Sequence, residues 1–163
     1  MGGLHVSENI RLQRRFWVAE RIGWGVLTLI VLAALLGLFG TGPLDRATAV
    51  AATHALRADY PRFARIQSPL SVTLRFEPPA GQARAQIWLE QSYLDAIDLK
   101  RITPEPESAV LGADRLTYVF ALGEEAGQRT VKIQFEARGP GSLEGRMGVV
   151  DAGEVNIGHF FYP

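Results

Sequence analysis

The sequence predicts a single membrane-spanning helix near the N-terminus, followed by an all-β domain built from two packed antiparallel sheets. Two observations lead to this fold class. Residues 22–40 form an apolar run without a charged side chain, and after it the hydrophobic period changes to the alternation of two that is typical of strands. A chain of 163 residues is long enough for one domain plus such an appendage.

The apolar run has the length of a helix that crosses a bilayer. About 19 residues at a rise of about 1.5 Å make roughly 28 Å, close to the roughly 30 Å of a hydrocarbon core. A core helix of a soluble protein would show polar residues at every third or fourth position. Here only Thr28 interrupts the run, and its hydroxyl can donate to a carbonyl of the preceding turn. We therefore predict a transmembrane helix over residues 22–40.

Arginines before the apolar run predict its orientation. Basic residues close to a span remain on the cytoplasmic side, so residues 1–21 are expected to form a cytoplasmic, partly helical basic tail. The rest of the chain then lies in the periplasm, with the helix in a bacterial inner membrane, since the Arg- and Ala-rich composition suggests a bacterial source. The residues expected at the membrane interface are Arg14, Arg15, Trp17, Arg21 and Trp24.

Two further features bear on the fate of the helix. The sequence Ala-Thr-Ala at positions 47–49 offers a signal-peptidase site, but the run exceeds the roughly 7–15 residues of a cleaved signal, so we expect the anchor to be retained. Ala33, Gly37 and Thr41 recur every four residues, and such a stripe of small residues lets a second helix pack closely. The alternative is that small residues are simply common in membrane helices.

After an expected linker at 41–54, residues 55–163 read as short strands. Clear alternation of apolar and polar residues occurs at 70–77, 116–122, 130–137 and 154–163, and weaker patterns occur at 56–60, 83–91, 96–102 and 147–150. Pro61 predicts an edge position for the strand at 56–60. The strands at 83–91 and 96–102 are expected to be joined by a bend or bulge. Segments rich in proline and glycine, such as 78–81 and 139–141, separate the runs.

About seven short strands in a domain of this size predict an immunoglobulin-like antiparallel β-sandwich, with a closed barrel as the alternative. Trp88 falls on the third expected strand, where such domains often bury a tryptophan. Its position opposes Ile87 and Leu89, so either this strand is buried on both faces or Trp88 is exposed. The chain contains no cysteine, which excludes the disulfide that joins the sheets of antibody domains.

The stretches "LRADYPRFARIQSP", "ITPEP" and the terminal "FFYP" resemble recurring elements of an uncharacterised family of small bacterial proteins. Members of this family have a single inner-membrane anchor and a periplasmic immunoglobulin-like β-sandwich. The resemblance covers most of the chain, and it implies the architecture described above. It implies no activity and no functional residues.

The sequence contains no motif of a catalytic site, so we expect a non-enzymatic protein without a cofactor. His159 shares the parity of Val155, Ile157 and Phe161 and is expected to face the core as a hydrogen-bonded structural residue. Two alternatives remain. A periplasmic copper-handling module would use His54, Met147 and His159, which are weak metal candidates because thioether and imidazole suit copper. An anchored hydrolase would use one of the carboxylate pairs at 95/98, 105/107 or 124/125.

Charge balance bears on the partners. Lys+Arg and Asp+Glu both number 17, so no overall field attracts nucleic acid. Arginines alternate with aromatic residues just after the linker, in a set formed by Arg57, Tyr60, Arg62, Phe63 and Arg65. Outside the membrane this set suits lipid head groups or an acidic partner surface, or the arginines simply lie on the solvated face of a strand. We expect the lipid bilayer and another envelope protein as partners, with the domain acting as an accessory protein.

Overall fold

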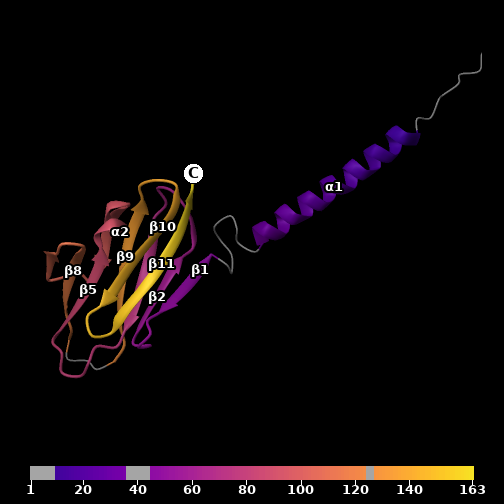
Figure 1. Ribbon diagram of the computed structural model, residues 1–163. Helices are drawn as coiled ribbons and strands as arrows, with labels where there is room; N and C mark the ends of the chain where they lie inside the picture. Colours follow the sequence, from indigo (N-terminus) through magenta and orange to yellow (C-terminus); the bar gives the residue numbers. More distant parts are fainter. Residues whose placement is uncertain (1–9, 36–44, 124–126) are drawn as a thin grey trace, which may run out of the picture.

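The computed structural model describes residues 10–35, 45–123 and 127–163 of the protein. An apolar helix is followed by an all-β domain in which two sheets pack against each other (Figure 1). At this level the predicted fold class is confirmed. Within the described residues the domain contains eleven strands, more than the predicted seven or so.

The helix α1 (Ile10–Leu35) begins in the basic segment and continues through the apolar run. Residues 15–35 are long and apolar enough to cross a membrane, and none of the most hydrophobic window is buried against the rest of the protein. Leu35, for example, is 70% exposed. The Thr28 hydroxyl donates to the carbonyl oxygen of Trp24 at 2.8 Å, as predicted, which hides the one polar side chain of the run.

Within the described part of the chain, sheet A has five strands and sheet B has six, and only the pair β3 and β11 is parallel. The order in sheet A is β1 (Arg46–Val50), β2 (Leu56–Pro61), β4 (Leu70–Phe76), β9 (Arg129–Ala137) and β6 (Ile97–Thr103). The order in sheet B is β3 (Phe63–Arg65), β11 (Gly153–Tyr162), β10 (Gly141–Val149), β5 (Arg84–Glu90), β8 (Arg115–Ala121) and β7 (Ser108–Leu111). A one-turn helix, α2 (Gln91–Asp95), connects β5 to β6.

The core lies between the two sheets and follows the predicted alternation. On β9 the inward residues are buried and their neighbours face solvent, and β4 and β11 show the same pattern. The largest fully buried side chains are Tyr93, Phe76, Phe135, Leu56, Leu74, Ile87, Leu89, Ile97, Ile133, Met147 and Val72. Each such aliphatic or aromatic side chain stabilises the fold by about 1.5–3 kcal/mol before entropy is subtracted. These side chains form one core cluster between the two sheets.

Residues predicted as a linker belong to the sandwich. Positions 46–50 form β1, which pairs antiparallel with β2 from Arg46 opposite Pro61 to Val50 opposite Arg57. As a result β2 is an interior strand and not the predicted edge strand. Pro61 is compatible with this position because it is the last residue of β2, and the following N–H of Arg62 donates to the Asp45 carbonyl.

The runs at 83–91 and 96–102 do form strands, but the predicted bend or bulge between them is wrong, because they lie in different sheets and the helix α2 connects them. The chain crosses from sheet B to sheet A through α2, whose turn is closed by the Ala96 N–H donating to the Tyr93 carbonyl at 3.2 Å. This crossing carries the Tyr93 side chain fully into the core.

Trp88 lies on the outer face of sheet B and is partly exposed. Its ring covers Gly148, where an added Cβ would meet the indole at 2.8 Å. The guanidinium of Arg115 stacks over the Trp88 ring, 4.7 Å from its centroid. Trp88 is therefore not the buried tryptophan of an antibody domain, and the large buried aromatic residue of this region is Tyr93.

Candidate functional site

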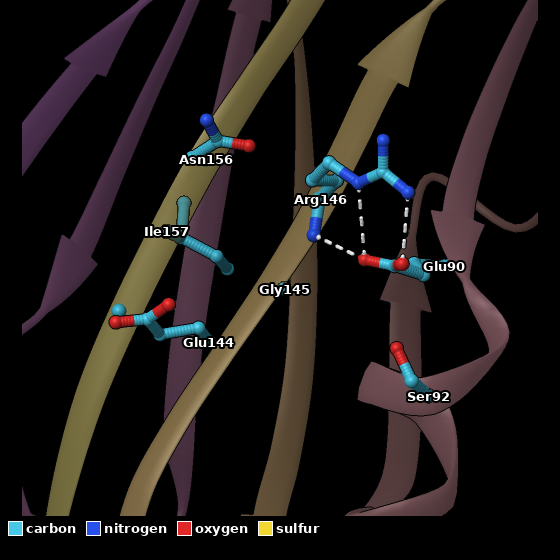
Figure 2. A pocket seen from close by; sticks show the side chains of 8 residues that line it. Glu90, Ser92, Glu144, Gly145, Arg146, Asn156 and Ile157 are labelled. Atoms are coloured by element: carbon cyan, nitrogen blue, oxygen red, sulfur yellow. Dashed lines mark hydrogen bonds and ion pairs between the residues drawn. The ribbon is translucent and has the colours of Figure 1, made fainter.

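A polar depression lies on the outer face of sheet B (Figure 2). Its volume is about 540 Å³, and it is lined by Glu90, Ser92, Glu144, Gly145, Arg146, Asn156, Ile157 and Gly158. The depression arises because β10 and β5 stay paired only from Met147 opposite Leu89 onward. Beyond Glu90 the chain turns into α2 and leaves the surface of β10 uncovered.

The floor of the depression needs a residue without a side chain. Gly145 lies on β10 directly above the ring of Tyr93, and an added Cβ would overlap that ring, with the Tyr93 Cγ only 2.7 Å away. Gly158 on β11 has open space, since the nearest atom to an added Cβ is a Glu144 carbon at 3.9 Å. The close approach of β10 to α2 therefore requires glycine at 145, whereas Gly158 only makes the depression wider.

Glu90 and Arg146 form the polar wall of the depression. The Glu90 carboxylate accepts hydrogen bonds from the Arg146 backbone N–H at 3.1 Å, from Nε at 3.4 Å and from Nη2 at 3.0 Å. Figure 2 shows the guanidinium reaching across from β10 to the end of β5. These bonds lower the pKa of Glu90, so the carboxylate remains charged and paired. The pair ties the end of β5 to β10 where the backbone ladder ends.

The chemistry of the depression suits binding. Ser92, Glu144 and Asn156 add a hydroxyl, a carboxylate and an amide to its rim. None of its lining residues is a histidine, a lysine or a cysteine, so the Ser92 hydroxyl has no base of those types within this described set. The arrangement can accept and donate hydrogen bonds to the polar side chains of a partner.

The same face of sheet B ends in an open edge at β7. All four β7 residues are exposed, and Leu111 is 71% exposed. The Gly112 N–H donates to the Arg115 carbonyl, which makes 112/115 a hydrogen-bonded pair of the β7–β8 ladder. Because such pairs alternate, the backbone groups of Ala109 and Leu111 point away from β8 toward the free edge.

The strand β7 was not predicted from the sequence. A signal was present, because Ala109, Val110 and Leu111 form a short apolar run between the prolines of the preceding turn and Gly112. The strand is only four residues long and shows no alternation, since neither face of an edge strand at this position is covered. Periodicity therefore could not detect it.

His159 faces the core, as predicted, and is 2% exposed. Its Nδ1 lies 2.6 Å from the Pro61 carbonyl oxygen and its Nε2 lies 3.0 Å from the Tyr93 hydroxyl. A carbonyl can only accept, so Nδ1 carries the proton and Nε2 accepts from the Tyr93 hydroxyl. Burial lowers the pKa of His159 and raises that of Tyr93, which favours this neutral pair. The rings of Tyr60, Phe135 and Phe161 surround the imidazole.

The structure does not bring the three metal candidates together. His54 lies in the turn between β1 and β2, at φ 58°, at the opposite end of β2 from the carbonyl that binds His159. Met147 is buried opposite Leu89 and Val155, four register positions from His159. Both ring nitrogens of His159 are already engaged. The described residues contain no group of three His, Cys, Asp or Glu side chains that could hold a metal ion.

The carboxylate pairs are held in surface interactions. Asp98 binds Lys100 at 2.6 Å, Asp95 accepts from Gln91 at 2.9 Å, and Glu107 binds Arg84 at 3.1 Å. The pair at 124/125 lies outside the described residues. None of the described pairs lines the depression, so these contacts place their carboxylates on the solvated surface of the sandwich.

Most residues predicted at the membrane interface lie on the surface of α1. Arg15, Trp17, Arg21 and Trp24 are exposed, and the guanidinium of Arg21 stacks 3.8 Å from the Trp17 ring centroid. Arg14 lies within the helix. Of the small-residue stripe, Ala33 is half-buried on α1, whereas Gly37 and Thr41 lie outside the described residues.

The basic and aromatic set after the linker is divided by the structure. Arg57 lies on the outer face of sheet A, 3.5 Å from Asp59, and Tyr60 packs against His159 with ring centroids 5.4 Å apart. Arg62, Phe63 and Arg65 lie instead at β3, on the edge of sheet B. The set is therefore not a single patch.

Comparison of the chain with models of protein families, with curated proteins and with solved structures found no match.

Proposed function

We propose that the protein is a non-enzymatic, single-pass protein of a bacterial inner membrane whose periplasmic β-sandwich binds or supports another envelope protein. In this proposal α1 is the anchor, the N-terminus is cytoplasmic, and the chain belongs to the family that its sequence resembles. The observation that carries the binding role is the open edge of β7, with its exposed Val110 and Leu111 and its outward backbone groups.

An open strand edge binds a partner by accepting one more strand. The outward N–H and C=O groups of Ala109 and Leu111 would pair with an extended segment of the partner, and the exposed side chains would contact its neighbours. Natural proteins usually protect such edges with charges or proline, because unpaired edges aggregate. The four residues of β7 carry neither. An envelope protein that supplies the missing strand would cover this edge.

Retention of the anchor is supported by β1. The possible cleavage site at 47–49 lies within this strand, where Ala49 is opposite Ala58. Cleavage there would cut β1 and expose the edge of β2 that β1 now covers. The physical cost of losing the strand favours a protein that keeps its helix.

Capture of the tagged full-length protein from detergent-solubilised native membranes tests the binding role. We expect the wild type to retain a membrane or envelope protein at a constant ratio. Ala109→Pro together with Leu111→Lys should lose it, because proline removes an outward N–H and lysine places a charge on the edge. Val50→Lys, a matched control at a similarly exposed residue of β1 (47% exposed), should retain it.

The capture experiment has two outcomes that count against the proposal. If the wild type repeatedly elutes alone, the accessory role loses its support. If Val50→Lys loses the partner and the β7 variant keeps it, the partner binds elsewhere on the sandwich. The orientation of the chain is tested separately by two reporters fused after Pro163. We expect an alkaline phosphatase fusion to be active, because that enzyme requires the periplasm. We expect a fusion to a fluorescent protein that folds only in the cytoplasm to be non-fluorescent.

We also propose that the sandwich is a variant of the immunoglobulin fold. The order β2-β4-β9-β6 corresponds to strands A-B-E-D of that fold, and β11-β10-β5 corresponds to G-F-C. The chain order differs from that of a variable immunoglobulin domain at β6, the counterpart of strand D. In variable domains the extra strands beside C precede strand D in the chain, whereas here β6 precedes β7 and β8. An experimental structure in which β6 pairs with β8 and not with β9 would contradict this assignment.

A further inference from the structure

A second surface, at the end of the sandwich where the chain enters it, combines two exposed arginines with two aromatic rings, of which Phe160 is exposed and Phe63 is half-buried. It consists of Arg62, Phe63, Arg65 and Phe160, and we call it the tether-side patch. Phe63 lies opposite Phe160 and Arg65 opposite Tyr162 in the parallel pairing of β3 with β11. Ala64 and Phe161 of the same two strands are buried, so their neighbours Phe63, Arg65 and Phe160 lie on the outer face of sheet B.

The backbone of the patch is held by hydrogen bonds, whereas several of its side chains are exposed. The Phe160 N–H donates to the Arg62 carbonyl at 2.7 Å, which fixes the position of β3 against β11. Phe160 nevertheless remains 50% exposed, and Arg62 and Arg65, which flank Phe63 and Ala64 in the chain, are exposed as well. Within the described part of the chain, neither arginine forms an ion pair with a carboxylate. Both guanidinium groups are available to an external anion.

Chain connectivity limits how far the patch can lie from α1. The Arg62 N–H donates to the Asp45 carbonyl, so the patch is directly attached to the first described residue of the domain. Asp45 follows Leu35, the last described residue of α1, by ten positions. Ten residues span at most about 35 Å when fully extended, whatever their conformation.

We propose that the tether-side patch binds the phospholipid head-group surface of the bilayer that holds α1. This inference depends on the proposed function, because it takes α1 as the membrane span. Arginine pairs with phosphate through two parallel hydrogen bonds, and exposed aromatic rings favour the boundary between head groups and acyl chains. A short tether raises the effective concentration of that surface at the patch, so a weak contact is enough to hold the sandwich in one orientation.

The contact also agrees with the placement of β7. Sheet B carries β3 and β11 at one edge and β7 at the other, with β10, β5 and β8 between them. A patch that rests on the bilayer therefore leaves the opposite edge free for a partner. The two surfaces serve different purposes, and each can be disabled without the other.

The absence of cysteine allows a single reporter to test the proposal. Ser142, exposed on β10 opposite Phe160, is replaced by cysteine and labelled with an environment-sensitive fluorophore in the full-length protein. The protein is incorporated into nanodiscs of phosphatidylethanolamine and phosphatidylglycerol that contain a lipid with a nitroxide on its head group. We expect this label to be quenched several-fold more than the same label on Val50→Cys, at the far end of β1.

Substitutions then separate the patch from general charge. Combining Phe160→Ser, Arg62→Gln and Arg65→Gln should reduce quenching at Ser142 to the level seen at Val50. The control Arg101→Gln with Lys132→Gln also removes two positive charges, but from exposed positions of sheet A, and it should leave the quenching at position 142 unchanged. Circular dichroism melts check that each variant is folded. High salt should weaken quenching in the wild type, because part of the attraction is electrostatic.

Equal quenching at the two label positions, or quenching that survives the triple substitution, overturns the lipid contact. An equal loss in the sheet A control also overturns it, because the attraction is then not specific to the patch. A failure of the proposed function looks different. If α1 is not a membrane span, the chain does not co-elute with the nanodiscs at all, whereas a failed patch leaves an incorporated protein whose sandwich is unquenched.

Discussion

The helix α1 and the sandwich are rich in the same types of apolar residue, which are exposed on the helix and buried in the sandwich. Leu29 and Leu35 of α1 are exposed, whereas Leu56 and Leu74 of the sandwich are completely buried. The sandwich hides its apolar side chains between two sheets that the chain itself provides. The helix has no such cover within the described residues, so its apolar surface requires surroundings that the chain does not supply.

The difference shows that the two regions depend on different solvents for their stability. Changes inside the sandwich should alter its free energy of unfolding and leave membrane association intact. Changes on the helix should do the reverse. The following predictions test this separation, beginning with the largest expected effect.

Two charges near the centre of the predicted membrane span at residues 22–40 should abolish membrane association. Each arginine at the centre of a span costs about 2.5–3.5 kcal/mol, so Leu29→Arg with Leu32→Arg costs about 5–7 kcal/mol. We expect the variant to leave the membrane fraction in flotation and alkaline extraction, while Leu29→Ala with Leu32→Ala stays. The thermal unfolding of the sandwich should be the same in both. A shared loss of sandwich stability would contradict the separation of the two regions.

Removing Tyr93 should destabilise the sandwich more than any surface change. Tyr93→Ala leaves a cavity in the core and deprives His159 of its donor, and truncations of large buried aromatic residues cost about 3–5 kcal/mol. Tyr93→Phe keeps the ring and loses only the hydroxyl, for about 1–3 kcal/mol. Urea unfolding of the full-length protein in detergent measures both. Equal free energies of unfolding for the two variants would show that packing of the Tyr93 ring does not stabilise α2 against the core.

A single methyl group at Gly145 should separate close packing from open surface. The added carbon of Gly145→Ala overlaps the Tyr93 ring, and overpacking of this kind costs about 1–3 kcal/mol. Gly158→Ala, in the same depression, meets nothing closer than 3.9 Å and should change stability by less than about 0.5 kcal/mol. The same unfolding experiment applies. A reversed order would show that β10 does not approach α2 as closely as described.

Acid should weaken the sandwich through His159. Its pKa in the folded protein is lowered by burial, so below its ordinary value of 6.5 the unfolded chain binds a proton that the folded chain does not. The contribution of neutral His159 to the free energy of unfolding is therefore fully present above pH 6.5. It decreases as the pH falls through that value, and the decrease is complete below the pKa of His159 in the folded protein. Unfolding free energies measured across this range should show the loss.

The variant His54→Gln is the control for the pH dependence, because His54 is exposed in a turn. It should retain the wild-type pH profile. His159→Leu should lower stability at neutral pH and flatten the profile in the acid range. A profile that remains steep in His159→Leu would assign the dependence to another group.

Local patterns in the sequence predicted the elements that one segment determines alone. The apolar run predicted α1, and alternation predicted the inward side of β4, β8, β9 and β11, including His159. Elements that form only through pairing or packing with a distant segment were missed or misplaced. β1 has small residues and one covered side, β7 has no covered side, and α2 is a single turn, so none of them has a period long enough to detect.

The candidate site was beyond sequence analysis for the same reason. Glu90 and Arg146 are 56 positions apart and meet only because β10 pairs with β5. Neither residue has a signal of its own, since a surface glutamate or arginine is common on any strand. The metal hypothesis failed in the opposite way, because suitable residue types were present in the sequence and the fold placed them apart.

By itself, the sequence determined that the chain has an apolar helix, a β domain without disulfides, and a histidine that faces the core. Only the tertiary structure decided that Pro61, Tyr93 and His159 form one hydrogen-bonded group, that β1 completes sheet A, and that β7 is left open. The physical reason is that burial periodicity is a property of consecutive residues. Register between distant strands is instead decided by the summed packing of both sheets, which no single segment encodes.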